Sequence, residues 1–253
     1  MSMFEIVFSP TGGTEKVSGL VTGTLDGNTV TVDLTDSGLD FHGVSMAKGD
    51  VAVISVPSYA GRAPAVAVER LGMVRGNGAR AVLVCVYGGR AFEDTLIELE
   101  DVAKRAGFRV VAAVSAIAEH SVARQFAAGR PDAQDVAQLS EFAQRIRQKL
   151  LDGAASEPSI PGNRPYKQAG GHSMVPHATE DCVSCGACAA LCPVRAIDKD
   201  DPRQVDGEAC ISCMRCVSVC SQNARKLDPN KLAAVTQMLS KACVERRECE
   251  IFI

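Results

Sequence analysis

The chain lacks long apolar runs and has no strong excess of either charge. No stretch reaches about 18 consecutive apolar residues, so no segment is predicted to span a membrane. The first residues, MSMFEIVFSPTGG, lack the basic start and long apolar core of a secretion signal. The net charge of −3 argues against nucleic acid as a partner, because phosphate backbones bind surfaces with a clear basic excess. Together these absences predict a cytoplasmic protein.

Cysteine, in contrast, is abundant, with 11 residues in a chain of 253. Without a secretion signal, this content favours metal or redox chemistry over disulfides. Ten of the 11 lie between Cys182 and Cys249, which indicates two domains of different character. The remaining one, Cys85, falls inside an apolar segment and is expected in the core. Cys243 and Cys249 lie outside the spaced runs, and we expect both to be free thiols.

The first 150 residues alternate short apolar segments with longer amphipathic ones. The apolar segments are residues 4–8, 30–34, 51–56, 81–86 and 110–117. Their near-continuous runs, rich in Val and Ile, are typical of strands buried on both faces. Helices are expected at residues 14–25, 64–74, 92–106 and 132–151. This alternation predicts an α/β domain at residues 1–151 with a doubly wound parallel sheet of five strands.

Three further segments complete the chain. Residues 152–177 are rich in Gly, Ser and Pro without periodicity, which predicts a linker lying on a surface. A cysteine-dense segment occupies residues 178–227. Within the last segment, residues 228–253, an amphipathic helix is expected at residues 229–245. The chain ends in Ile-Phe-Ile, and an apolar end rarely stays in solvent, so we expect it to pack on one of the domains.

The cysteine-dense segment contains two runs of the form Cys-x2-Cys-x2-Cys-x3-Cys. The sequence CVSCGACAALCPVRAI begins at Cys182, and CISCMRCVSVCSQNAR begins 28 residues later at Cys210, which predicts a pseudo-twofold domain. Soft thiolates in a tight loop suit three corners of a cubane, and the fourth cysteine of each run then ligates the other cluster. We therefore expect two [4Fe–4S] clusters. One would be held by Cys182, Cys185, Cys188 and Cys220, and the other by Cys192, Cys210, Cys213 and Cys216.

Zinc is the alternative, because Cys-x2-Cys pairs also form tetrahedral zinc sites. A zinc site, however, has no need of a third cysteine at x2 and a fourth at x3. The pattern resembles the bacterial two-cluster ferredoxin over about 50 residues, which implies a small α+β domain. Pro193 follows the first run as in that family, but Ser221 replaces the second expected proline. We expect this change to alter the surroundings of the cluster bound by Cys220.

A loop of hydroxyl residues and glycines joins the first apolar segment to the first expected helix. Its candidate residues are Ser9, Thr11, Gly12, Gly13 and Thr14. Backbone N–H groups, hydroxyls and the helix dipole at such a position bind phosphate. The loop has no lysine and no G-x-G-x-x-G motif, which argues against nucleoside triphosphates and dinucleotides. Neutral donors suit a phosphate monoester such as that of FMN, and an ordinary turn capped by Thr14 is the alternative.

Two more candidate loops follow the third and fourth apolar segments, where open α/β sheets bind their ligands. Their candidate residues are Pro57, Ser58, Tyr59, Ala60, Gly61, Tyr87, Gly88, Gly89 and Arg90. Each loop offers an aromatic ring for stacking and small residues that expose the backbone to a flat ligand. The chain has three tyrosines, and the placement of two in these loops favours a binding role over packing within the loop.

With these loops, residues 1–150 resemble a flavodoxin. The order of domains resembles the flavodoxin–ferredoxin fusion proteins of anaerobic bacteria and archaea over nearly the whole chain. The resemblance implies FMN, with its phosphate in the loop of residues 9–14, Tyr59 and Tyr87 beside the isoalloxazine, and Gly88 and Gly89 near its polar edge.

Two arginines in these loops depart from the flavodoxin pattern, and a histidine is expected at the same edge of the sheet. Arg62 or Arg90 near the N1/C2 carbonyl would stabilise the anionic reduced flavin and raise its potential. A solvated arginine on a loop is the alternative. His120 follows the fifth apolar segment and would act as a proton donor near the flavin, or as a hydrogen-bonded structural residue.

These cofactors predict an electron-transfer protein that exchanges low-potential electrons between FMN and a redox protein partner, such as a ferredoxin, a reductase or a dehydrogenase. Placing both cofactors on one chain gives them a high effective concentration. The enzyme alternative is a ferredoxin-fed FMN reductase of a small acceptor such as a quinone, and a redox sensor is a third reading. The long linker is also compatible with a domain-swapped homodimer.

Overall fold

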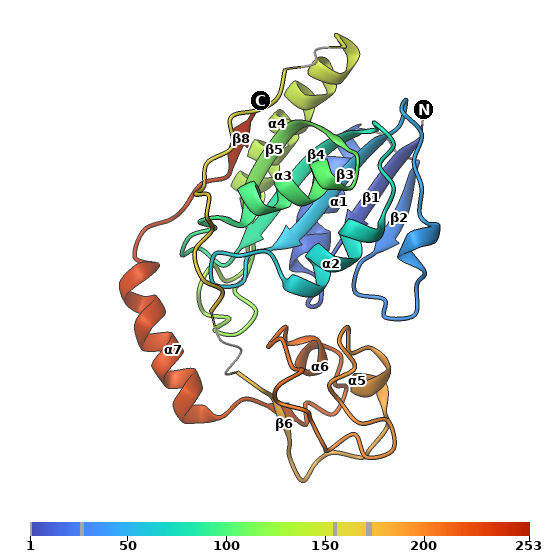
Figure 1. The fold of residues 1–253 in the computed structure, drawn as a ribbon. Coiled ribbons are helices and arrows are strands. Elements are labelled where there is room, and N and C mark those ends of the chain that lie inside the picture. Colours follow the sequence, from blue (N-terminus) through green and yellow to red (C-terminus); the bar gives the residue numbers. More distant parts are fainter. Residues whose placement is uncertain (1, 26–27, 154–155, 171–173) are drawn as a thin grey trace.

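A parallel sheet forms the centre of the N-terminal domain in the computed structural model, which describes residues 2–25, 28–153, 156–170 and 174–253 (Figure 1). Its parallel strands are β1 (Met3–Val7), β2 (Thr29–Asp33), β3 (Val51–Pro57), β4 (Arg80–Tyr87) and β5 (Arg109–Ile117). They lie in the order β2-β1-β3-β4-β5. This is the strand order of a flavodoxin-like doubly wound sheet. The predicted fold class is therefore confirmed.

Helices cover both faces of the sheet. One face carries α1 (Gly13–Leu25) and α4 (Ala133–Leu151), and the other carries α2 (Ala65–Met73) and α3 (Thr95–Arg105). A short 3-10 helix, η1 (Phe41–Gly43), lies between β2 and β3.

Helix α3 begins at Thr95, not at the expected Phe92. Asp94, just before it, is buried and accepts hydrogen bonds from the backbone N–H groups of Asn163 and Lys167. The contact with this distant segment holds the preceding residues in a turn, which the local sequence pattern does not reveal.

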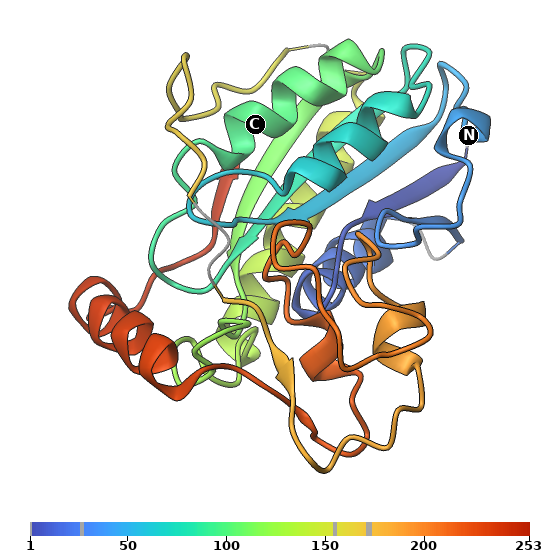
Figure 2. The same cartoon turned by 60° about the horizontal axis from the view of Figure 1, so that its bottom comes forward.

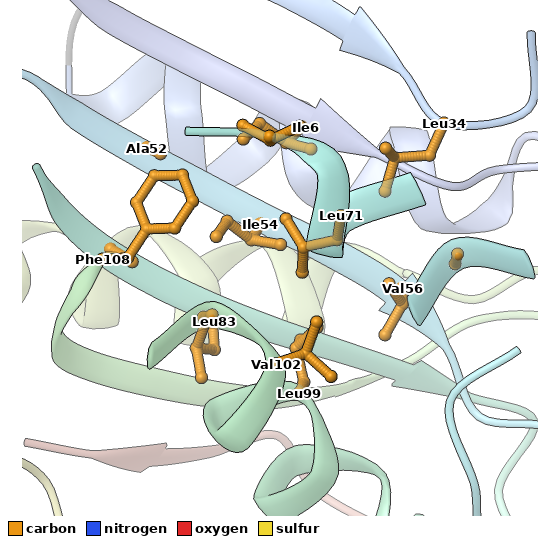
Figure 3. Close-up of a cluster of buried hydrophobic side chains, with 14 of the residues drawn as sticks. Ile6, Leu34, Ala52, Ile54, Val56, Leu71, Leu83, Leu99, Val102 and Phe108 are labelled. Carbon is orange, nitrogen blue, oxygen red and sulfur yellow. The ribbon is translucent and has the colours of Figure 1, made fainter. Parts of the chain in front are cut away.

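The central strands show why their apolar runs are continuous. Along β3, Ala52, Ile54 and Val56 belong to the core beneath α2 and α3, where Leu71 and Leu99 also lie (Figure 3). Val51 and Val53 belong to the opposite core with α1 and α4, where the buried Ser55 donates a hydrogen bond to Ser18 Oγ of α1. Because successive strand residues point to opposite faces, a strand covered on both sides is apolar at nearly every position.

The end of the chain adds a sixth strand to the sheet. β8 (Glu250–Phe252) pairs antiparallel with β5, with Ile251 opposite Val114. The expectation that the apolar end packs on a domain is thus met by strand pairing, which also covers the edge of β5. The segment before β8 is held by Arg246, which forms ion pairs with Asp132 and Asp135.

Residues 156–170 of the predicted linker lie along α3. Arg164 pairs with Glu100 and Asp101, and the Tyr166 hydroxyl donates to Asp101. Residues 154–155 and 171–173 of that segment lie outside the described residues.

The cysteine-rich region, residues 178–227, lies across the carboxyl ends of the parallel strands, as Figure 2 shows. It contains α5 (Ala187–Ala190), α6 (Arg215–Ser218) and β7 (Arg225–Lys226), which pairs with β6 (His177–Ala178). From there α7 (Pro229–Ala242) runs back toward the sheet (Figure 1). No helix among the described residues is long and apolar enough to cross a membrane.

The two halves of the cysteine-rich region repeat in backbone detail. Ser184 and Ser212 have φ of 52° and 53°, and Arg195 and Asn223 have φ of 53° and 51°. The fourth cysteine of each run also has the same contact: Cys192 Sγ accepts from the N–H of Ala196 at 3.3 Å, and Cys220 Sγ accepts from that of Ala224 at 3.2 Å. The 28-residue sequence repeat therefore corresponds to a structural repeat.

Candidate cofactor sites

A cavity lies at the carboxyl ends of the parallel strands, and we call it the strand-end cavity. Loops after β1, β3, β4 and β5 form most of its wall, as is general for ligand sites in open α/β sheets. Of the residues predicted from sequence, its lining includes Thr11, Gly13, Thr14, Pro57, Ser58, Tyr59, Ala60, Tyr87 and Gly88. The other predicted residues of these loops, Ser9, Gly12, Gly61, Gly89 and Arg90, do not line it.

The loop before α1 is shaped to expose the helix N-terminus to this cavity. Ser9 Oγ accepts a hydrogen bond from the N–H of Glu15 at 2.9 Å, so it caps the first turn. Gly12 has a φ of +86°, a left-handed conformation that favours glycine. Gly13 lies so close to the β5 loop that an added Cβ would stand 3.2 Å from Ala118 Cβ. The free N–H groups of the first turn fit a phosphate.

A cation reaches the same loop from the cysteine-rich region. Arg215 Nη1 donates to the carbonyl oxygen of Ser9 at 3.1 Å and more weakly to that of Pro10 at 3.5 Å. The loop itself contains only neutral donors, so the domain contact adds positive charge beside the candidate phosphate site. The sequence contains no local signal for this contact.

The two tyrosines line the cavity in different surroundings. Tyr59 is half-buried, and desolvation of its hydroxyl raises its pKa well above the ordinary value, with a smaller contribution from Cys213. Tyr87 is buried and packs on Phe92 with ring centroids 5.6 Å apart. Burial raises the pKa of Tyr87 to about 12. Both rings are therefore neutral over the ordinary pH range, as suits stacking on a flat ligand.

His120 lines the cavity beside Gly88. Its Nδ1 accepts hydrogen bonds from the N–H groups of Val122 at 3.2 Å and Ala123 at 3.1 Å. Burial, and then the charge of Arg90, lower the pKa of His120. Both observations indicate a neutral ring with its proton on Nε2. The ring packs so tightly that a Cβ on Gly88 would stand 2.4 Å from His120 Cδ2.

Neither arginine of the loops reaches the cavity. Arg62 forms a two-bond ion pair with Glu98, at 2.8 and 2.6 Å, and its guanidinium stacks over the Tyr166 ring. Arg90 pairs with Glu93 at 3.0 and 2.9 Å. Both guanidinium groups pair with carboxylates, an arrangement that neither expectation, a place at a flavin edge or a solvated position on a loop, describes.

The cysteines gather around two small cavities in the cysteine-rich region. The first cysteine cavity is lined by Cys182, Cys185, Cys188 and Cys220. The second cysteine cavity is lined by Cys192, Cys210, Cys213 and Cys216. These are the two sets that the sequence pattern predicts, with the fourth cysteine of each run crossing to the other set.

The donor chemistry of these cavities fits iron–sulfur clusters. Neither wall includes a carboxylate or a histidine, so only soft sulfur ligands are offered. Among the described residues, no group of three or more His, Cys, Asp or Glu has the geometry of a single-ion site. A cubane holds its four thiolates farther apart than a single metal ion does. The four cysteines around each cavity therefore suit a cluster and not a single ion.

Ile211 and Ser212 connect the two kinds of site. Both residues lie between Cys210 and Cys213 and line the strand-end cavity, and Ile211 also lines the second cysteine cavity. Gly170 contributes to the strand-end cavity from the linker. The Ser212 Oγ is buried and has no hydrogen-bond partner within the described chain. These wall residues were not among the candidates predicted from the sequence, and neither were Pro10, Val86, Ala118, Glu119, Ser121 and Val122.

The cysteine-rich region falls within a segment that matches a known family. Residues 156–237 match a family described as a 4Fe-4S dicluster domain. The match includes the segment along α3 and most of α7 as well as the cysteine-rich region. No curated protein sequence matches the chain.

Similar solved structures include several flavodoxins. The flavodoxin of Streptococcus pneumoniae TIGR4 is 20% identical, and the alignment covers 58% of this chain and 99% of that one with a TM-score of 0.41. Flavodoxin 2 of Bacillus cereus is 15% identical over 59% of this chain and 99% of that one, with a TM-score of 0.44. A flavodoxin from the domain Archaea is 10% identical over 60% and 99%, with a TM-score of 0.41. From its strand order and the matched segment, the chain joins a flavodoxin-like α/β domain to a 4Fe-4S dicluster domain.

Proposed function

We propose that the chain is an electron-transfer protein that holds two [4Fe–4S] clusters and FMN. It exchanges low-potential electrons between FMN and a redox protein partner by way of the clusters. The observation that carries this proposal is the position of Ile211, a residue that lines both the strand-end cavity and the second cysteine cavity. The two candidate cofactor sites therefore share a wall residue.

The residues that would hold the cofactors follow from the lining of each cavity. The two four-cysteine sets would hold the clusters, and the first turn of α1 with Thr11 and Thr14 would hold the FMN phosphate. Tyr59 and Tyr87 would pack against the isoalloxazine. When bound, clusters with thiolate ligands transfer one electron each and FMN accepts one or two.

Contacts within one chain hold the two domains together. Besides Arg215, Arg195 Nη2 donates to the carbonyl oxygen of Ser37 at 2.6 Å, and Arg70 Nη2 donates to that of Pro193 at 2.6 Å. β8 ties the end of the chain to the sheet. These contacts favour transfer within one chain over the domain-swapped homodimer, because the cysteine-rich region already completes the strand-end cavity of its own chain.

The test begins with anaerobically purified full-length protein, which should contain about eight irons and one FMN. Photochemical reduction of the clusters should then be followed by flavin bleaching at a rate independent of protein concentration. A rate proportional to protein concentration would support transfer between chains. Zinc in place of iron would contradict the whole proposal.

His120 favours a second function, the FMN-dependent reduction of a small acceptor such as a quinone. Its neutral ring lines the cavity and carries a proton on Nε2, which suits donation to a reduced acceptor. Steady-state oxidation of the reduced protein by a series of quinones would test this function. Saturable turnover that falls at least tenfold in His120→Gln, with FMN retained, would support a reductase. Slow oxidation that does not saturate, at the same rate in the wild type and His120→Gln, would contradict the reductase function and support electron transfer.

A further inference from the structure

Arg225 is a buried cation with no acidic partner among the residues that the structure describes. Its side chain lies in the wall of the first cysteine cavity, and the residue is 2% exposed. Nη2 donates to the carbonyl oxygen of Pro202 and lies 3.4 Å from Cys188 Sγ. Nε and Nη1 are buried and have no hydrogen-bond partner within the described chain. A guanidinium keeps its charge under all ordinary conditions, so this charge is buried with most of its donors unused.

The internal repeat shows that packing does not require an arginine at this position. Ile197 stands 28 residues earlier, at the equivalent place in the first run, and is 4% exposed within the small core of the cysteine-rich region. The residues before them match too, since Ala196 and Ala224 make the same bond to a cysteine sulfur. An aliphatic side chain therefore fills one half of the domain where the other half buries a charge.

Burying an unpaired charge is far more costly than burying an aliphatic side chain of similar size. The cost is offset only if a negative group occupies the space beside the guanidinium. A [4Fe–4S] cluster with four thiolates carries net negative charge, and Cys188 belongs to the set that faces Arg225.

We propose that the buried positive charge of Arg225 stabilises the reduced form of the cluster held by Cys182, Cys185, Cys188 and Cys220. The two clusters, which are otherwise similar, would then have different reduction potentials. Reduction adds one electron, and hence one negative charge, to a cluster from the external reductant, while Arg225 neither gains nor loses a proton. The nearby cation makes that added charge more favourable. This inference rests on the proposed function, because it requires both clusters to be bound.

The experiment is an anaerobic redox titration of the full-length holoprotein, followed by the electron paramagnetic resonance of the reduced clusters. Arg225→Met keeps the length of the side chain and removes the charge. We expect it to shift the midpoint of one cluster downward by at least the equivalent of a tenfold change in the reduced-to-oxidised ratio, which is about 59 mV for a one-electron couple. Arg225→Lys keeps the charge and should retain most of the wild-type midpoint.

Arg203→Met is the matched control. Arg203 is exposed and donates to the carbonyl oxygen of Cys182 at 2.7 Å. The Arg203→Met substitution therefore removes a charge that lies near the same cluster but is in contact with solvent. Solvent screens such a charge, and its loss should shift the midpoint by less than a third as much. An equal shift in Arg203→Met, or an unchanged midpoint in fully loaded Arg225→Met, would overturn the inference.

Failure of assembly is also informative. If Arg225→Met loses the iron of one cluster while Arg225→Lys retains both, the need for a charge is upheld. Loss of iron in both variants would mean that the site needs the shape of arginine, which contradicts a role in charge. A wild-type protein without iron would refute the proposed function, whereas loaded wild-type and Arg225→Met proteins with equal midpoints refute the role of Arg225 alone.

Discussion

Arg215 Nη1 lies 3.1 Å from the carbonyl oxygen of Ser9 and donates a hydrogen bond across the boundary between the two domains. Arg215 stands between Cys213 and Cys216, and Ser9 stands in the loop that opens α1. The contact therefore joins the second cysteine cavity to the candidate phosphate loop, and it brings a positive charge to a loop without one.

Removal of this contact should weaken the binding of FMN. Arg215→Met loses charge-assisted hydrogen bonds to the loop, each of which contributes roughly 1.5–3 kcal/mol. Because Arg215 is partly exposed, we expect a smaller net effect, an increase in the FMN dissociation constant of about tenfold. Anaerobic titration of flavin fluorescence measures it. Arg195→Met is the control, since Arg195 also joins the domains, through Ser37, but does not contact the candidate phosphate loop. Equal weakening in both variants would point to general loosening of the interface.

Exchange of Cys192 should remove the cluster of the other run. Cys192 lies with Cys210, Cys213 and Cys216 around the second cysteine cavity, so Cys192→Ser should leave about four irons, held by the first set. Cys243→Ser should keep about eight, because Cys243 lines neither cysteine cavity. Iron analysis with electron paramagnetic resonance checks both. Loss of the cluster held by Cys182, Cys185 and Cys188 instead would overturn the crossed pairing.

Gly88→Ala should damage both stability and the cavity wall. Its Cβ would stand 2.4 Å from His120 Cδ2 and 2.7 Å from His120 Cβ, so the imidazole must move. Such overpacking costs about 1–3 kcal/mol of unfolding free energy, and we expect FMN to bind less tightly as well. Denaturant unfolding and flavin titration measure the two effects. The second substitution His120→Ala should restore much of the stability, and Gly19→Ala, with open space around its Cβ in α1, should not destabilise.

His120 should make folding stability depend on pH in a defined direction. Its pKa is lowered in the folded protein, chiefly by burial, so the unfolded chain takes up a proton on this ring at a higher pH than the folded chain does. Stability therefore falls as the pH falls below the ordinary histidine value of about 6.5 and approaches the lowered folded pKa. Unfolding free energies measured between pH 7.5 and about 5 should decline less steeply in His120→Gln. A slope equal to that of the wild type would show that His120 is not the titrating group.

The sequence by itself determined the elements and the cofactor chemistry that they suggest. The Val-rich apolar runs of β3 and β4 predicted strands buried on both faces, because strand periodicity and burial are local properties of a segment. The spacing of the cysteines likewise predicted which side chains gather in each set, since a repeated spacing implies a repeated loop.

Tertiary structure alone decided which distant segments meet. Ile211 and Arg215 reach the strand-end cavity and its loop because the cysteine-rich region lies across the carboxyl ends of the strands. β8 extends the sheet by pairing with the outer edge of β5. Arg62 lies in a loop that the sequence predicts at the cavity, but its side chain forms an ion pair with Glu98. Local periodicity records how one segment is buried, whereas the docking of domains depends on surfaces formed only after each domain has folded.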